Sequence, residues 1–279
     1  MHLNRGPEWK QNNSGGHRPM KRLIALLVLL TSARLAAGGF DDMVLWRYEL
    51  PASSQNSFSL EPLRICQNGF MATFLHADPY RIGSLHWNYA AFKYGLTKWG
   101  IFGGARFYGL NDLYSDDLIT IGGALRPHPD FALAISINHE REQFQEIDSY
   151  NRFDLDAKMS GSISSFTGVI DLDRISIMKS YDFPGMATPE PMFYGSLKFN
   201  KDYRLSIGAK RLHTRRTRWF FNQDANIIDG IGLRLGYFSN PNVFNWGLDL
   251  NWKSFTFEFT YFAMSRLNDT MALGLTIAM

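Results

Sequence analysis

The chain has 279 residues, of which 29 are Lys or Arg and 26 are Asp or Glu, so its net charge is +3. Six of the basic residues and one of the acidic residues fall within residues 1–37, which leaves 23 basic and 25 acidic side chains in the rest. This balance gives no reason to expect a nucleic-acid partner. The single cysteine, Cys66, excludes an intramolecular disulfide and a metal site built on thiolates.

Residues 20–38 have the layout of a secretory signal peptide. Lys21 and Arg22 precede an unbroken apolar run over 23–30, and small residues follow. A membrane-anchoring helix is the alternative, but such a helix needs roughly twenty apolar residues. We therefore predict a cleavable signal and export from the cytoplasm.

The predicted domain organisation follows from that signal. Residues 1–38 are expected to be a disordered extension plus the signal peptide, and Met20 is an alternative start of the chain. Residues 39–279 show no linker and no repeat of fixed period, so we predict one domain there.

Short runs with β-strand character follow one another along this domain. Residues 38–90 are the least regular part, with possible strands at 43–50, 69–75 and 81–89, and residues 51–62 read as loop. Beyond them the pattern is regular, and turns rich in Asn, Asp, Gly and Pro separate the runs. The predicted strands there are 91–98, 101–109, 118–125, 131–141, 151–160, 164–172, 175–180, 193–200, 203–212, 216–221, 230–238, 243–251, 254–262 and 270–278.

The clearest alternation lies near the C-terminus. Phe255, Phe257, Phe259 and Tyr261 alternate with small or polar residues, one of which is Glu258. Successive side chains of a strand point to opposite faces of a sheet, so this strand has one apolar face and one polar face.

Three features favour a membrane barrel over a secreted β-sandwich, which remains the alternative. The strands are about nine to eleven residues long, which suits a tilted crossing of a bilayer. The polar face carries many charges, as in the strand that contains Asp154, Asp156 and Lys158, and an export signal precedes the strands. We predict an all-β fold, an antiparallel transmembrane β-barrel of about 14 strands (range about 12–16) with an apolar outside and a polar lumen. Glycines on the polar face would leave room for charged side chains.

Hairpin geometry predicts an ion cluster in the lumen. A turn near 240–241 sets Arg234 opposite Gly247, and a turn near 252–253 sets Gly247 opposite Glu258. Asp249 would lie diagonal to Arg234, and neighbouring strands are about 4.8 Å apart. We predict a luminal ion cluster of Arg234, Asp249 and Glu258, together with Asp154, Asp156 and Lys158 of the charged strand. It either fills and rigidifies the barrel or forms a constriction or substrate site.

A second charged region is the basic run over 210–218. Arg215, Arg216 and Arg218 are expected at the outer rim, where they would meet lipopolysaccharide phosphates or simply face solvent. Counting back from the C-terminus puts 252–254 and 200–202 among the periplasmic turns and puts the long 181–192 segment outside.

No catalytic set emerges from the remaining polar residues. The histidines are scattered, and none has a serine or carboxylate at a diagnostic spacing. No pair of His or acidic residues has metal-ligand spacing, and no glycine loop suits a phosphate. We expect neither enzymatic activity nor a cofactor nor a metal.

The last third of the chain resembles the PorV/PorQ-like outer-membrane proteins, which are relatives of the FadL-type barrels. The resemblance rests on Gly232-Leu233-Arg234-Leu235-Gly236-Tyr237, then Asn240-Pro241-Asn242, then Trp246-Gly247-Leu248, and extends weakly through 91–141. It implies an outer-membrane barrel that is, in some members, a partner of type IX secretion and, in FadL relatives, a hydrophobic-solute transporter. The chain is shorter than those relatives, no long N-terminal plug is evident, and the last residue is Met279 rather than an aromatic one.

Two classes of function stay open for this barrel in a Gram-negative outer membrane. A channel or transporter, for hydrophobic or other small solutes, would have a continuous lumen. A structural or secretion-associated scaffold would have a lumen closed by its own side chains and a protein partner on its loops. In either case the expected surroundings are outer-membrane lipid and lipopolysaccharide.

Overall fold

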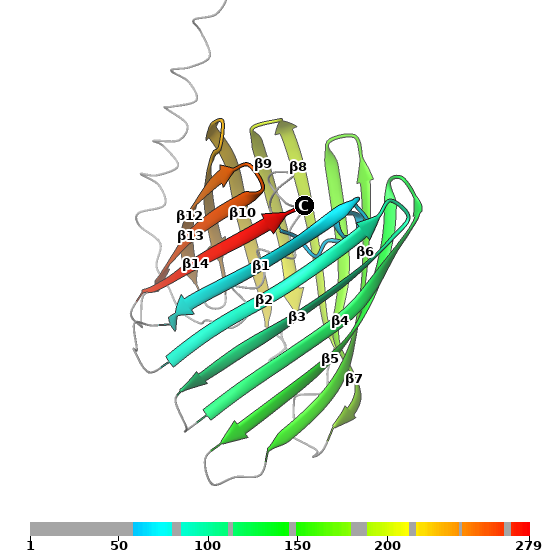
Figure 1. Cartoon of the computed structure of the whole chain (residues 1–279), viewed down its shortest axis with the longest axis vertical. Coiled ribbons are helices and arrows are strands. Elements are labelled where there is room, and N and C mark those ends of the chain that lie inside the picture. The colour runs from blue at the N-terminus through cyan, green and yellow to red at the C-terminus, as the bar shows by residue number, and fades with distance from the viewer. Residues whose placement is uncertain are drawn as a thin grey trace, which may run out of the picture. The chain divides into compact units, whose positions relative to one another are not determined.

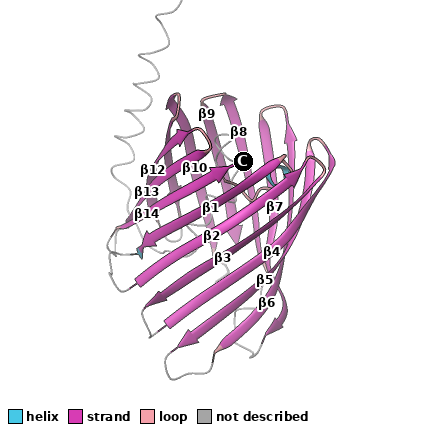
Figure 2. Ribbon diagram, in the orientation of Figure 1, coloured by secondary structure: helices cyan, strands magenta, loops and turns pink. Residues whose placement is uncertain are grey.

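The computed structural model describes residues 58–79, 85–110, 114–144, 149–179, 189–211, 216–239, 242–264 and 269–279. They form a closed antiparallel barrel in which the last strand pairs with the first (Figure 1). Strands make up nearly all of this part of the chain, beside one short helix (Figure 2). The extension and signal peptide predicted for residues 1–38 lie outside the described residues.

The barrel has fourteen strands, as predicted. They are β1 (Gly69–Asp78), β2 (Leu85–Leu96), β3 (Trp99–Leu110), β4 (Tyr114–His128), β5 (Phe131–Phe144), β6 (Tyr150–Ile163), β7 (Phe166–Lys179), β8 (Glu190–Asn200), β9 (Tyr203–Arg211), β10 (Thr217–Ile228), β11 (Ile231–Phe238), β12 (Val243–Trp252), β13 (Phe255–Met264) and β14 (Thr270–Ala278). Several are longer than the nine to eleven residues expected, and β4 has 15.

The strand boundaries differ from the prediction most clearly in three strands. Parts of the separate runs 81–89 and 91–98 belong to one strand, β2, parts of the runs 164–172 and 175–180 belong to one strand, β7, and β10 continues to Ile228 beyond the predicted end at 221. β7 contains register shifts against β6, and an extra residue at a bulge breaks the two-residue period on which the prediction relied. The turn between the predicted strands 118–125 and 131–141 comprises only residues 129–130, because β4 continues through a bulge to His128.

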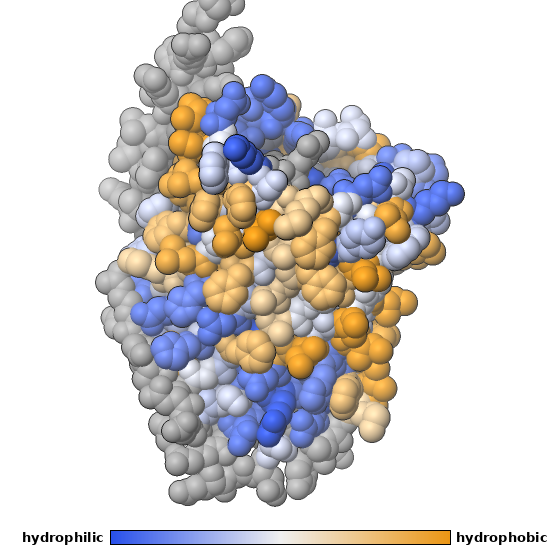
Figure 3. Space-filling model, in the orientation of Figure 1, coloured by the Kyte–Doolittle hydropathy of each residue, from blue (hydrophilic) through white to orange (hydrophobic). Residues whose placement is uncertain are grey.

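The two faces of the barrel wall differ in polarity. In β13, Phe257 faces outward and is 47% exposed, whereas its neighbour Thr256 faces the lumen and is fully buried. Large apolar side chains on the other strands are exposed in the same way, for example Ile121 and Leu273. Figure 3 shows the resulting apolar zone on one face, with hydrophilic residues toward both ends.

The two ends of the barrel differ in their connections. Six two-residue turns lie at one end, which we call the short-turn end; they are 97–98, 129–130, 164–165, 201–202, 229–230 and 253–254. Thr97, Ser164 and Lys253 have positive φ in these turns, as primed hairpin turns require. The C-terminal Met279 also lies there, because its backbone exchanges two hydrogen bonds with Phe70. The longer connections lie at the opposite, long-loop end, as the count from the C-terminus predicted.

Residues 58–68, which precede β1, lie inside the barrel. Helix α3 (Pro62–Ile65) contacts β2, β3, β4, β5 and β6. Phe58, Ile65 and Cys66 are buried there. We call residues 58–68 the plug segment. No sequence pattern predicted the plug segment, because a short run with no strand or helix periodicity reads as loop. Within the described part of the chain, no helix is long and apolar enough to span a membrane.

Candidate functional site

The plug segment begins with a helix cap. Glu61 has extended backbone angles, and its carboxylate accepts a hydrogen bond from the Leu63 amide at 3.0 Å. Pro62 occupies the first helical position, where the lack of an N–H costs nothing. The Glu-Pro pair therefore starts a single helical turn, which orients the residues that follow it.

Polar contacts join this turn to the barrel wall. The Leu63 amide also donates to Ser160 Oγ on β6 at 3.0 Å. On the other side, Lys93 Nζ on β2 donates to the Arg64 carbonyl at 2.9 Å, and Thr97 Oγ1 donates to Asn68 Oδ1 at 2.6 Å. Hydrogen bonds thus hold the plug from both sides.

A strip of small residues on the inner wall makes room for the plug. Gly69, Gly95, Gly100, Ala124 and Ala134 follow one another across β1 to β5, each opposite the next. A methyl group on Gly95 would overlap the carbonyl oxygens of two plug residues, and one on Gly100 would lie 2.5 Å from the Ile65 carbonyl oxygen. The plug backbone lies against this strip, which we call the small-residue strip.

The apolar side of the plug packs beside that strip. Ile65 and Cys66 form a buried cluster with Phe102, Ala124 and Ala134. Burial raises the pKa of the Cys66 thiol, although the nearby Arg126 opposes this effect in part. Cys66 is therefore a protected thiol between the plug and the wall.

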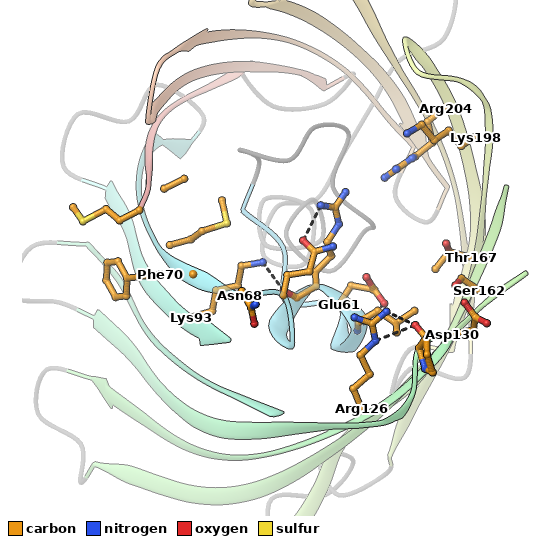
Figure 4. A pocket seen from close by; sticks show the side chains of 18 of the residues that line it. Glu61, Asn68, Phe70, Lys93, Arg126, Asp130, Ser162, Thr167, Lys198 and Arg204 are labelled. Atoms are coloured by element: carbon orange, nitrogen blue, oxygen red, sulfur yellow. Dashed lines mark hydrogen bonds between the residues drawn. The ribbon is translucent and has the colours of Figure 1, made fainter. Parts of the chain in front are cut away.

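A cavity of about 850 Å³ lies at the short-turn end between the plug and the wall (Figure 4). We call it the vestibule. Its lining carries five basic side chains against two acidic ones, Glu61 and Asp130. The basic residues are Arg64, Lys93, Arg126, Lys198 and Arg204. No sequence motif marked this site, because its residues come from the plug and from the ends of distant strands.

Farther inside, the wall carries three clusters of buried ion pairs. In the first cluster, Arg106 pairs with Asp116 and lies 3.4 Å from Glu140. Glu140 also pairs with Arg152, whose Nε is 2.6 Å from Asp154 Oδ2. Asp154 was predicted to face the lumen, and the structure places it there.

The second cluster follows on β6 to β9. Lys158 Nζ lies 2.6 Å from Asp171 Oδ2 and 3.9 Å from Asp173 Oδ1. Lys210 Nζ lies 2.9 Å from Asp173 Oδ2 and 3.2 Å from Glu190 Oε2. Asp156, which was predicted together with Lys158, accepts a hydrogen bond from Asn138 at 2.5 Å.

The third cluster contains the residues predicted near the C-terminus. Arg234 lies opposite Gly247, pairs diagonally with Asp249, and is 3.7 Å from Asp224 Oδ1. The predicted register of the next hairpin was wrong by two residues. Asp249, not Gly247, lies opposite Glu258, because the turn comprises residues 253–254.

Glu258 is placed differently from the prediction as a result. It is buried and lies opposite Gly274, where a methyl group would come 3.1 Å from its Oε2. Two carboxylates, those of Asp249 and Glu258, thus face each other across β12 and β13. Asp224, which the sequence analysis missed, lies beside Arg234 instead.

The basic run predicted for the rim is only partly exposed. Arg218 is buried and lies opposite Lys210, so it faces the lumen, whereas Arg216 is exposed. Arg215 lies outside the described residues. The three arginines therefore do not form one described surface.

Apolar side chains also line part of the lumen. Phe58 of the plug belongs to a buried cluster with Trp87, Tyr194, Phe220 and Phe238. The luminal glycines were predicted to leave room for charged side chains, but some of them leave room for aromatic rings. A methyl group on Gly208 would overlap the Phe220 ring, and one on Gly122 would overlap the Phe102 ring.

Among the described residues, no group of three or more His, Cys, Asp or Glu side chains is arranged to hold a metal ion. Carboxylates in all three clusters pair with Arg or Lys side chains.

Comparison with solved structures supports the fold. The CymD monoaromatic hydrocarbon channel has a TM-score of 0.57 at 8% sequence identity, over 84% of this chain and 95% of that one. Weaker likenesses include the KdgM porin, with a TM-score of 0.41 at 11% identity over 75% and 99% of the two chains. A mutant of the Rhodopseudomonas blastica porin has a TM-score of 0.41 at 6% identity over 76% and 99%. No protein-family model and no curated protein sequence matches the chain.

Proposed function

We propose that this protein is a non-enzymatic outer-membrane channel for small solutes, and that its plug segment obstructs the lumen. The exposed apolar side chains around the wall support a lipid environment, because exposed surfaces of that size and polarity suit a membrane rather than water. The short-turn end would face the periplasm, as in bacterial outer-membrane barrels.

The course of the ion pairs carries this proposal. Every ion pair described in the three clusters joins residues on the same strand or on strands at most two positions apart, such as Arg106 with Glu140 and Lys210 with Asp173. These pairs run along the wall and do not bridge opposite sides of the barrel. The plug lies in the lumen instead, where Leu63, Arg64 and Asn68 contact the wall through hydrogen bonds. An obstruction of this kind can move without breaking the wall.

Conductance in planar bilayers tests the channel with a variant that acts on the plug alone. Gly95→Ala adds a methyl group that overlaps the plug backbone, so it should raise the open probability over that of the unmodified protein. Gly161→Ala is the matched control, because its methyl group would lie 3.7 Å from the nearest atom, an ordinary contact. Absence of conductance from both the unmodified protein and Gly95→Ala, each shown to be folded, would refute the channel.

A hydrophobic solute is a second candidate, because of the luminal apolar cluster around Trp87 and Phe220. The fold likeness to a monoaromatic hydrocarbon channel fits this candidate. Uptake of toluene and of a neutral sugar into proteoliposomes distinguishes the two. Preference for toluene that falls in Trp87→Ser would support the hydrophobic route, and equal sugar uptake would contradict it.

The resemblance to PorV/PorQ-like proteins adds a secretion-associated role as a separate proposal. Its residues lie in β11 and β12, while Asn240 and Pro241 fall outside the described residues. Such a role requires a protein partner at the loops. Co-purification of the intact protein from outer membranes, followed by identification of bound proteins and lipopolysaccharide, tests it.

A further inference from the structure

Two cations face each other at the wall of the vestibule. Lys198 on β8 lies directly opposite Arg204 on β9, and both line the cavity. Figure 4 shows the two side chains next to each other, extending from the wall toward the cavity. Like charges directly opposite each other on neighbouring strands are destabilising. This arrangement favours a negatively charged group between them.

A third cation comes from the plug. Arg64 lines the same cavity, and burial together with the nearby Arg204 guanidinium lowers the pKa of Arg64. Two carboxylates act on this group of cations, since Glu61 attracts Arg64 and Arg204, and Asp224 attracts Arg204. Three cations therefore face two carboxylates.

The two other basic residues of the vestibule have separate roles. Lys93 donates to the Arg64 carbonyl, and Arg126 Nε donates to the Pro129 carbonyl at 2.9 Å. They add positive potential to the cavity while their hydrogen bonds hold the plug and a turn. The part of the vestibule beside β8 and β9 holds the two opposed cations, and Arg64, which also donates to Gln67 Oε1 at 3.1 Å, adds its charge to theirs.

We propose that a small anion with phosphate or carboxylate groups binds in the vestibule between Arg64 of the plug and Lys198 and Arg204 of the wall. Guanidinium groups bind such planar or tetrahedral oxyanions through paired N–H donors. Because one cation belongs to the plug and two belong to the wall, the bound anion links the plug to the wall. This site does not depend on whether a solute crosses the barrel.

Binding is measured by isothermal titration of pyrophosphate, and separately of citrate, into the full-length protein in an uncharged detergent. We expect saturable binding that weakens as NaCl is raised, because salt screens these charges. Lys198→Gln combined with Arg204→Gln should weaken binding at least about tenfold, since charge-assisted hydrogen bonds are lost. Arg64→Gln should weaken it as well.

Lys201→Gln is the matched control, because Lys201 lies in the turn of the same hairpin and does not line the vestibule. Lys201→Gln removes one positive charge, as Lys198→Gln does, and should leave the affinity for the anion unchanged. Lys198→Gln alone, at a solvent-exposed side chain, serves if the double variant fails to fold. No saturable binding to the unmodified protein, or equal loss in Lys201→Gln and the double variant, would overturn the proposal. Binding without conductance would refute only the channel.

Discussion

Gly95 on β2 lies directly opposite Gly100 on β3, and the Ile65 carbonyl of the plug lies against both glycines. A glycine has no Cβ, so the backbone of another segment can approach a glycine more closely than it can approach any other residue. The position of the plug thus depends on the lack of a Cβ atom at Gly95 and Gly100. Changes at these positions should affect the plug before they affect the barrel.

Labelling of Cys66 should report plug displacement. Cys66 is fully buried, and burial raises its pKa, so both access and thiolate formation limit its reaction while the plug is in place. Overpacking costs about 1–3 kcal/mol, so Gly95→Ala should increase maleimide labelling by at least about fivefold. Gly161→Ala should label at the unmodified rate. Equal rates in all three proteins would show that the plug does not depend on this glycine.

Removal of Arg234 should destabilise the barrel. Arg234→Met leaves Asp249 buried without its guanidinium partner and removes one of the two arginines that attract Asp224, at a cost of about 3–5 kcal/mol measured by urea unfolding in lipid vesicles. Adding Asp249→Asn should restore part of the loss. The control, Arg141→Gln, lies on an exposed site and should change stability by less than about 0.5 kcal/mol. A loss in the control as large as that in Arg234→Met would rule out a role for the buried pair.

A lysine on the outer surface tests for contact with lipid. Leu273 is 58% exposed in the middle of β14, so Leu273→Lys should cost about 2–4 kcal/mol of folding free energy in bilayers. Thr217→Lys, at the end of β10, should cost about 0–1 kcal/mol, because the charge there reaches the interface. If Leu273 faced water, its replacement by lysine would be neutral, and the membrane proposal would fail.

The contact between Gly208 and Phe220 predicts a coupled pair of substitutions. Gly208→Ala should cost about 1–3 kcal/mol, because the new methyl group overlaps the Phe220 ring across β9 and β10. The same change should cost less in a Phe220→Leu background, where the ring is gone. Thermal unfolding of the four proteins gives this difference, and additive effects would mean that the ring does not pack there.

Alternation predicted the strands, and strand length, the charged polar face and the export signal were needed as well to predict the barrel. Along β13 the side chains alternate between the two faces of the wall, as the two-residue period predicted. Phe257 is exposed and its neighbour Thr256 is buried. The placement of Arg234 opposite Gly247 followed from the turn at 240–241. The error in the following hairpin came from the turn itself, because residues 253–254 form a two-residue turn and the prediction began it one residue early.

The vestibule and the plug were beyond the reach of the sequence. Glu61 and Arg64 lie in a segment with no repeated pattern. Lys198 and Arg204 come close to that segment only in the closed barrel. Gly95 and Gly100 carried no sign that a carbonyl group lies over them. Sites assembled from single residues of distant strands depend on three-dimensional packing, which periodicity does not record.

The length of β5 has a consequence for how the molecule meets its surroundings. Its outward residues are the exposed apolar Leu133, Ile135 and Ile137, but then His139 and Arg141, so the strand continues past the oily part of the wall. β11, on the other side, has only eight residues. At about 3.3 Å per residue, β5 is about 20 Å longer than β11. In the membrane proposed above, the long-loop rim would extend farther beyond the lipid at β5 than at β11, so a protein that approaches this end would reach β5 first.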